Sequence, residues 1–327
     1  MTHSNTPLLK LNDLSLQIGQ NSIELMAGVS LSVSKGETLC IVGESGCGKS
    51  LTALSIMGLL PPALLRGVRG EMVFDGQMFA LNDPVALANI RGRKIGMIFQ
   101  EPMSSLNPAY RIGDQIAEAW RCHNDGDGTD QALAMLRKVG IPAPEARMND
   151  YPHQMSGGMR QRVMIAMALV NSPDLLIADE PTTALDVTIQ AEILDLIGDL
   201  QKGGDMATIM ITHDLGVVAE LATKVVVMYA GKVVESGSAE AIFRDPQHPY
   251  TIGLMSSLPS LRGPRSRLST VAGMVPTIET MPQGCRFSTR CPFAQSRCDT
   301  TPVLTEVTPD HHVACHFAPL EQLAGAA

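Results

Sequence analysis

The sequence predicts an α/β fold in which helices cover a parallel sheet. Short apolar runs alternate with helical patterns along the chain, and near residue 40 a strand, a glycine-rich loop and a helix follow one another. No internal repeat or low-complexity tract in the sequence indicates a solenoid. The predicted strands are residues 38–42, 95–99, 175–178, 208–212 and 225–229.

Two further segments define the predicted domains. Between Met103 and Met155, amphipathic patterns at residues 112–121 and 130–139 predict a helical insertion. From Pro246 onward, prolines, serines and arginines become frequent and the apolar periodicity fades. We therefore expect one domain over residues 1–245, with a helical subdomain at about 103–170, and a separate C-terminal extension over residues 246–327.

Composition and charge narrow the possible partners. The chain has 327 residues and a net charge of −8 without long blocks of like charge, so it lacks the basic stripe that nucleic-acid binding requires. The N-terminus does not have the pattern of a secretory signal, and no run approaches the roughly 20 apolar residues of a membrane-spanning helix. We expect the chain to stay in the cytosol and to reach a membrane only through partner proteins.

A phosphate-binding loop is predicted at residues 43–50, which match the pattern G-x-x-x-x-G-K-[ST] between a strand and a helix. The glycines let backbone N–H groups turn toward an anion, Lys49 can reach the outer phosphates, and the Ser50 hydroxyl can bind Mg²⁺. We therefore predict a site for ATP and Mg²⁺ made by Gly43, Glu44, Ser45, Gly46, Cys47, Gly48, Lys49 and Ser50.

Two carboxylates follow the apolar strand at residues 175–178. We predict that Asp179 supports the coordination shell of Mg²⁺ through water and that Glu180 polarises the attacking water as general base. Gln100, at the end of the strand at 95–99, is predicted to reach the metal or this water. His213, after the strand at 208–212, is predicted to hold the terminal phosphate.

A second anion site is predicted at Ser156, Gly157 and Gly158, which open a helix that continues to Val170. Ser156 is a natural N-cap, and the glycines expose N–H groups at the positive end of the helix dipole. The chain has one phosphate loop, so this second site is best used on a nucleotide that another chain holds. We therefore expect a head-to-tail pair that sandwiches two nucleotides.

In order and spacing, these motifs resemble those of ABC transporter ATP-binding subunits over the first three-quarters of the chain. The matching motifs are the Walker A loop at 43–50, the Q-loop at Gln100, the signature at 156–161, the Walker B strand at 175–180, the D-loop at Ala184, Leu185 and Asp186, and the switch His213. The resemblance implies a P-loop NTPase (RecA-like) core, a small antiparallel β subdomain and a helical ABC subdomain. It also implies that ATP closes the dimer, that hydrolysis opens it, and that the helical region meets the coupling helices of two membrane-spanning permease subunits.

The sequence departs from the family pattern in two ways. The signature begins with Met155 instead of Leu and has Met159 in place of Gln, which keeps the helix start and its N–H groups. The stretch from Leu14 to Gly28 has no aromatic residue to stack on adenine, and Ile18 is the nearest candidate. We therefore expect function to survive the first change and nucleotide selectivity or affinity to be weaker because of the second.

A narrower resemblance concerns the cargo. The chain is similar to dipeptide and oligopeptide importer subunits at residues 96–108, 178–190 and 248–251. Nickel and glutathione importers share much of this sequence. The resemblance implies an ATPase that energises peptide uptake at the cytoplasmic face of the inner membrane. It also implies an extracytoplasmic substrate-binding protein and, by the habit of the subfamily, a heterodimer with a second ATPase subunit.

Four of the seven cysteines lie close together in sequence near the C-terminus, at Cys285, Cys291, Cys298 and Cys315. Gathered thiolates repel one another and need a cation or cluster. No tight pair of the kind usual for zinc exists, and the wide spacing favours an iron–sulfur cluster whose charge Arg286, Arg290 and Arg297 could offset. A similar tail in some peptide-importer subunits carries a four-iron cluster, so the resemblance implies [4Fe–4S]; zinc, disulfides or no metal stay as alternatives.

Two other classes of function compete with an importer ATPase. A soluble ABC-type ATPase of DNA repair or translation would commonly carry two cassettes or a long coiled-coil insertion and a basic surface, which this chain lacks. A redox-sensing regulator built on an inactive cassette would explain the cysteines. However, Lys49, Asp179, Glu180 and His213 are all present, which argues against inactivity.

Overall fold

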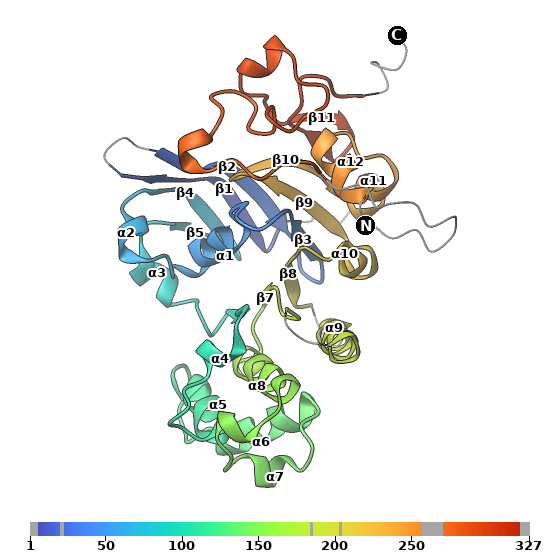
Figure 1. The fold of residues 1–327 in the computed structure, drawn as a ribbon. Coiled ribbons are helices and arrows are strands. Elements are labelled where there is room, and N and C mark those ends of the chain that lie inside the picture. The colour runs from blue at the N-terminus through green and yellow to red at the C-terminus, as the bar shows by residue number, and fades with distance from the viewer. Residues whose placement is uncertain (1–5, 20–22, 184–185, 203–204, 257–270, 321–327) are drawn as a thin grey trace, which may run out of the picture. The chain divides into compact units, whose positions relative to one another are not determined.

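The computed structural model describes the chain except for residues 1–5, 20–22, 184–185, 203–204, 257–270 and 321–327. The described residues divide into two compact units (Figure 1). We call residues 34–37 and 84–211 the helical unit, and residues 6–33, 38–83 and 212–327 the phosphate-loop unit. The D-loop residues Ala184 and Leu185 lie outside the described residues.

An antiparallel sheet forms one part of the phosphate-loop unit, with strand order β2-β1-β4-β5. Its strands are β1 (Leu9–Ile18), β2 (Ile23–Val33), β4 (Val68–Phe74) and β5 (Gln77–Ala80). Leu9, Leu11, Leu14 and Leu16 are fully buried, while the polar residues between them are more exposed. This alternation buries one face of the sheet. The family resemblance implied a small antiparallel part, and it is present.

The second sheet of this unit is built on a parallel pair, β3 (Thr38–Val42) and β9 (Lys224–Tyr229). Every residue of β3 is buried, as expected for a strand with both faces covered. β10 (Lys232–Ser238) returns antiparallel to β9, because only Ala230 and Gly231 join them and both have positive φ angles of 45° and 80°. A two-residue turn of this kind makes a hairpin, so our expectation of a purely parallel sheet was wrong at this edge.

The C-terminal segment joins this sheet as well. β12 (His311–Val313) pairs antiparallel with β10, and β11 (Thr305–Thr308) pairs with β12. The segment also holds α12 (Pro249–Met255) and short 3-10 turns at Ile278–Thr280 and Ser296–Asp299. The described residues after Pro246 therefore belong to the phosphate-loop unit.

Four other helices belong to the phosphate-loop unit. They are α1 (Lys49–Met57), α2 (Pro62–Leu65), α10 (Leu215–Leu221) and α11 (Ala239–Arg244). Helix α1 begins within the last residues of the phosphate loop, at Lys49, after Gly48, which adopts a left-handed conformation at the N-cap. Its buried face includes Ala53, Ile56 and Met57.

The helical unit contains a parallel sheet of β6 (Ile95–Ile98), β7 (Leu175–Asp179) and β8 (Ala207–Thr212). The expected strands at these places are confirmed, with ends shifted by one residue. Figure 1 shows α5 (Ile112–Arg121), α6 (Thr129–Lys138) and α8 (Gly157–Leu169) packed together in the predicted helical subdomain. The unit also has α3 (Pro84–Ala88), α4 (Pro102–Ser105), α7 (Pro144–Arg147), a 3-10 turn at Pro152–Gln154, and α9 (Val187–Lys202).

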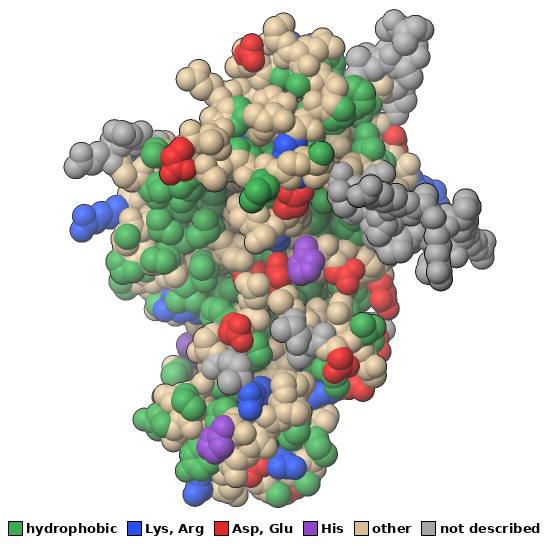
Figure 2. All heavy atoms as spheres, viewed as in Figure 1, with side chains coloured by type: hydrophobic (Ala, Val, Ile, Leu, Met, Phe, Trp, Pro, Cys, Tyr) green, Lys and Arg blue, Asp and Glu red, His purple; other side chains and the backbone are tan. Residues whose placement is uncertain are grey.

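Two general features bear on possible partners: the distribution of surface charge and the character of the helices. On the face drawn in Figure 2, the described Lys and Arg side chains are scattered among Asp and Glu and form no continuous stripe. Within the described part of the chain, no helix has both the length and the apolar character that crossing a membrane would need.

Candidate nucleotide site

The phosphate loop connects β3 to α1 and owes its shape to three glycines with positive φ. Gly43, Gly46 and Gly48 have φ angles of 152°, 81° and 96°. A Cβ on Gly43 would collide with the backbone carbonyl of Met228 in β9, so a larger residue cannot replace it without moving a central strand. The loop ends at the N-terminus of a nine-residue helix, where backbone N–H groups and the helix dipole favour an anion.

Lys49 is the first residue of α1 and is 5% exposed. Its ammonium group donates to the carbonyl oxygens of Gly43 and Glu44 at 2.8 and 3.0 Å, so it spans the inside of the loop. Cys47 is fully buried beneath the loop, and burial raises the pKa of its thiol. A neutral thiol at this position adds no negative charge beside the predicted triphosphate site.

Glu44 makes its contacts with residues far away in the sequence. Its backbone N–H donates to the Tyr250 hydroxyl at 2.8 Å. Its carboxylate forms an ion pair with Arg290, at 2.7 Å for the shorter of two hydrogen bonds. Our assignment of Glu44 to the nucleotide stays a prediction, while in this structure both its N–H and its side chain bind the C-terminal segment.

The helical unit brings Gln100 and Glu180 together. They follow β6 and β7, whose parallel pairing places both strand ends at one edge of the sheet. The Gln100 amide Nε2 lies 3.3 Å from Glu180 Oε2, and the Thr183 hydroxyl donates to the same oxygen at 2.9 Å. Glu180 also has a φ of 46°, an uncommon conformation for a residue with a side chain. Two donors and a fixed turn therefore aim this carboxylate.

The remaining predicted site residues lie at the ends of strands or at the start of α1. Asp179 is the last residue of β7 and is 5% exposed, and Ser50 lies in the first turn of α1. His213 follows β8 and is exposed, directly before Asp214, which caps α10 by accepting from the N–H of Gly216. Their roles toward Mg²⁺ and phosphate stay predictions.

The signature segment forms the N-terminus of α8 as expected. The Ser156 hydroxyl caps the helix by accepting from the N–H of Met159 at 3.3 Å. A Cβ on Gly157 would have nothing within 4 Å, whereas one on Gly158 would touch Ile189 at 3.0 Å. The space beside Gly157 is therefore open, and the role of this helix start as an anion site stays a prediction.

Gln161 connects the signature helix to the turn after β7. Its side chain is 2% exposed, and its Nε2 donates to the carbonyl of Pro181, the residue that follows Glu180. A buried amide that spans these two motifs couples the position of one to that of the other. This link was not predicted, although Gln161 lies within the signature, five positions after Ser156.

The four C-terminal cysteines share one neighbourhood. Burial raises the pKa of Cys285 and Cys315, and that of Cys291 to about 11, and neighbouring cysteines add to each of these shifts. The N–H of Phe317 lies 3.5 Å from the Cys315 sulfur. Among the described residues, however, no three His, Cys, Asp or Glu side chains are grouped closely enough to hold a metal ion.

The arginines beside these cysteines do not have the role that we expected. Arg286 pairs with Glu24 at 2.9 Å, Arg290 pairs with Glu44, and Arg297 lies over the ring of Phe317 at 4.9 Å. Two of the three therefore neutralise carboxylates elsewhere in the unit. The interpretation that they offset a cluster's charge is wrong for Arg286 and Arg290.

Comparison with known proteins identifies the family. The family model described as "ABC transporter" matches residues 26–183, and the model described as "Oligopeptide/dipeptide transporter, C-terminal region" matches residues 234–298. A Sinorhizobium fredii protein named "Probable peptide ABC transporter ATP-binding protein" is 51% identical, with 94% of each chain covered. The chain belongs to the ABC transporter ATP-binding family. Dipeptide transport ATP-binding proteins of Bacillus subtilis and Escherichia coli are 49% and 47% identical, over 90% and 95% of this chain and 89% and 96% of theirs.

Solved structures support the cassette fold of this ABC family member. A dimeric ATP-binding cassette in a post-hydrolysis state, bound to ADP and Pi, is 29% identical with a TM-score of 0.61. The match covers 71% of this chain and 98% of that one. A cassette of Clostridium perfringens that is part of the CbiONQ transporter complex is 27% identical with a TM-score of 0.60, over 72% of this chain and 90% of that one.

Proposed function

We propose that the chain is the ATP-hydrolysing subunit of an ABC importer that energises the uptake of peptides. The observation that carries this proposal is the near full-length identity of 47–51% to peptide and dipeptide transport ATP-binding proteins. The match of residues 234–298 to the C-terminal region of oligopeptide and dipeptide transporters supports the same cargo.

Within this function, the predicted site residues have different roles toward one bound nucleotide. The N–H groups of the phosphate loop and Lys49 bind the triphosphate, while Ser50, Gln100 and Asp179 surround Mg²⁺, directly or through water. Glu180 accepts a proton from the attacking water, and His213 holds the terminal phosphate. The contacts of Gln100 and Thr183 to Glu180 support its role, because they orient the carboxylate before the reaction.

We further propose that the signature segment completes the site of a second ATPase chain. The capped helix start and the open space beside Gly157 support this arrangement, because a phosphate of a partner's nucleotide can approach the N–H groups closely. The partner is a second ATPase subunit that is not identical to this chain. The pair works with two membrane-spanning permease subunits at the cytoplasmic face of the membrane, and an extracytoplasmic binding protein delivers the peptide.

The test is transport by the complete complex, reconstituted in proteoliposomes with E180Q in this chain. We expect peptide-stimulated phosphate release from this chain's site to fall by about 10²–10⁴-fold, because the general base is lost, while ATP stays bound. E240Q is the matched control, since it removes an exposed carboxylate of a surface pair with Arg244. Hydrolysis in E180Q at the wild-type rate, or stimulation by nickel or glutathione but not by di- and oligopeptides, would contradict the proposal.

For the C-terminal cysteines we propose an iron–sulfur cluster, preferably [4Fe–4S]. Their mutual effect on pKa and the N–H donor beside Cys315 support a shared ligand set, since N–H groups near sulfur stabilise thiolates that hold iron. When bound, such a cluster would supply a structural cross-link or redox sensitivity to this segment.

Anaerobic purification tests the cluster. We expect about four irons and four sulfides per chain with broad visible absorption, and loss of both in C298S. Stoichiometric zinc, or neither metal, would refute this assignment while leaving the ATPase proposal intact.

A further inference from the structure

The phosphate loop carries an acidic residue at its second position, Glu44, close to where a triphosphate would bring several negative charges. An unpaired carboxylate there would repel the ligand. In the structure this carboxylate is bound on both oxygens by Arg290, through Nη1–Oε2 at 2.7 Å and Nη2–Oε1 at 3.0 Å. The side chains are 4% and 30% exposed, so solvent screens the pair only in part.

Arg290 uses all five of its N–H groups. Besides the two bonds to Glu44, its Nε donates to the carbonyl of Ala272 at 2.8 Å and its Nη2 to that of Val271 at 2.9 Å. Its Nη1 lies 3.4 Å from the Tyr229 hydroxyl. The hydrogen bond to Glu44, before the other contacts, raises the pKa of the guanidinium above its usual value. A lysine could not reproduce this fork of donors.

The remaining support of Glu44 comes from an aromatic cluster. Tyr229 packs edge-on against Tyr250 at 4.7 Å between ring centroids and against Phe287 at 5.1 Å. Tyr229 and Tyr250 are fully buried, and the Tyr250 hydroxyl accepts the N–H of Glu44. The backbone and the side chain of one loop residue are therefore held separately, by residues 206 and 246 positions later.

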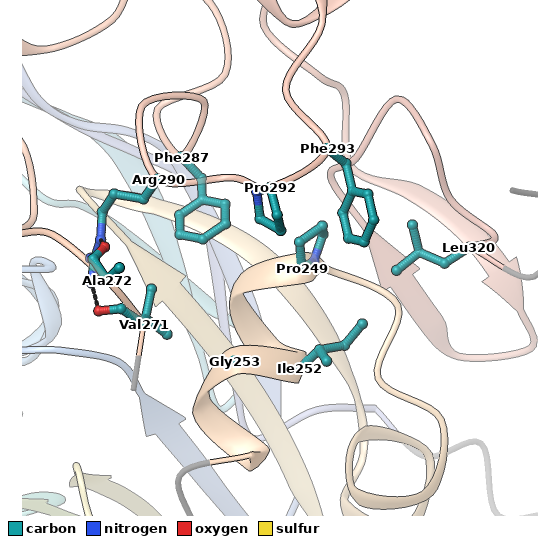
Figure 3. A pocket seen from close by; sticks show the side chains of 10 residues that line it. All are labelled: Pro249, Ile252, Gly253, Val271, Ala272, Phe287, Arg290, Pro292, Phe293 and Leu320. Atoms are coloured by element: carbon teal, nitrogen blue, oxygen red, sulfur yellow. Dashed lines mark hydrogen bonds between the residues drawn. The ribbon is translucent and has the colours of Figure 1, made fainter. Parts of the chain in front are cut away.

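Arg290 also lies at the edge of an apolar cavity of about 660 Å³ in the C-terminal segment (Figure 3). Figure 3 shows its guanidinium turned toward Val271 and Ala272, away from Phe293 and Leu320. The backbone carbonyls of Val271 and Ala272, which accept from the guanidinium, thus help to hold it in this orientation.

We propose that Arg290 is a positioning residue for nucleotide binding, through which the C-terminal segment sets the affinity of the phosphate loop for ATP. It neutralises Glu44 and turns the carboxylate away from the phosphates, while Tyr250 fixes the adjoining backbone. This inference rests on the proposed function, since it assumes that the loop binds ATP. It assigns to the C-terminal segment a direct effect on the phosphate loop within the same chain.

The experiment measures the Kd of MgATP for the purified full chain by calorimetry. R290M leaves Glu44 without its partner, and we expect Kd to rise about tenfold, within the usual range for coupled sites. R290K keeps the charge but loses the fork, so it should fall between R290M and the wild type. The double variant R290M/E44Q should recover most of the lost affinity, because the unpaired charge is gone.

The matched control is R286M. Arg286 lies in the same segment and pairs with Glu24 in β2. This variant therefore loses an ion pair of the C-terminal segment that does not involve the Glu44 carboxylate. We expect its Kd to change less than that of R290M by a clear margin. Thermal unfolding of each variant shows whether the fold is kept.

The outcomes distinguish a failure of the role proposed for Arg290 from a failure of the proposed function. Equal Kd values for R290M and the wild type, equal losses in R290M and R286M, or no recovery in R290M/E44Q would each overturn the role of Arg290. If R290M does not fold, R290K and E44Q give the same comparison. A wild-type chain that does not bind MgATP would overturn the proposed function and this inference together.

Discussion

Glu44 and Glu180 are both acidic residues that follow a buried strand, but different parts of the chain hold them. Glu180 is bound by Gln100 and Thr183, which lie in the same unit and belong to the motifs around it or to the neighbouring strand end. Glu44 is bound by Tyr250 and Arg290, which belong to the C-terminal segment. The Glu180 carboxylate is therefore oriented by residues of nearby motifs, whereas Glu44 is held by residues far away in the sequence.

This difference fits the roles that we propose for the two side chains. Glu180, as the proposed general base, must present an oxygen to water at one position, which two nearby donors can define. A carboxylate in a phosphate loop must instead be kept away from the ligand, and this requires a strong cation outside the loop. The C-terminal segment supplies that cation, so it is part of the nucleotide site in an energetic sense.

The largest expected effect is on the stability of the C-terminal segment that supports Glu44, and it depends on pH. Burial lowers the pKa of His248 to about 4, against an opposing effect of Glu235, and His248 Nδ1 accepts the N–H of Tyr250 at 3.0 Å. A neutral ring is favoured in the native state, so its contribution is fully present above about pH 6.5 and is lost as pH falls toward 4. Over that window the wild type should lose about 3 kcal/mol of stability more than H248N, whose side chain still caps α12 but does not titrate.

Denaturant unfolding of the wild type and H248N at several pH values between 7 and 4 checks this expectation. Comparison of the two chains removes the effect of the other groups that titrate in both. Parallel stability curves for the two proteins would mean that His248 does not stabilise the segment that carries Tyr250.

A smaller effect is expected for the link between the signature and the turn after β7. Q161M removes the buried amide that donates to the Pro181 carbonyl and leaves that acceptor without this donor. We expect a loss of about 2 kcal/mol in the free energy of unfolding and a lower rate of hydrolysis with unchanged ATP affinity. If ATP affinity fell together with stability, the contacts around Glu180 and those around Glu44 would not act separately.

The smallest effect is expected at the signature cap. S156A removes the hydroxyl that accepts the Met159 N–H and should cost about 1 kcal/mol of stability. S156N restores a capping acceptor, so its stability should return to near that of the wild type. If both variants unfold at the wild-type denaturant concentration, the cap does not stabilise the start of α8.

Much of the phosphate loop could be predicted because its chemistry is local in sequence. The spacing of Gly43, Gly48 and Lys49 between an apolar strand and a helix is itself the physical requirement, and the structure has this strand, loop and helix at the expected place. The same holds for Ser156 at the start of α8. Hairpin β9–β10 was missed because a two-residue turn at Ala230 and Gly231 leaves little signal between two apolar runs.

By itself, the sequence determined the motifs that point to ATP, their order along the chain, and the strands and helices that carry them, because each depends on residues a few positions apart. Only the tertiary structure decided what Arg286 and Arg290 bind. Their partners lie some 250 residues earlier, in β2 and the phosphate loop. An ion pair depends on distance in space, and no periodicity or spacing encodes the folding that brings such distant residues within 3 Å.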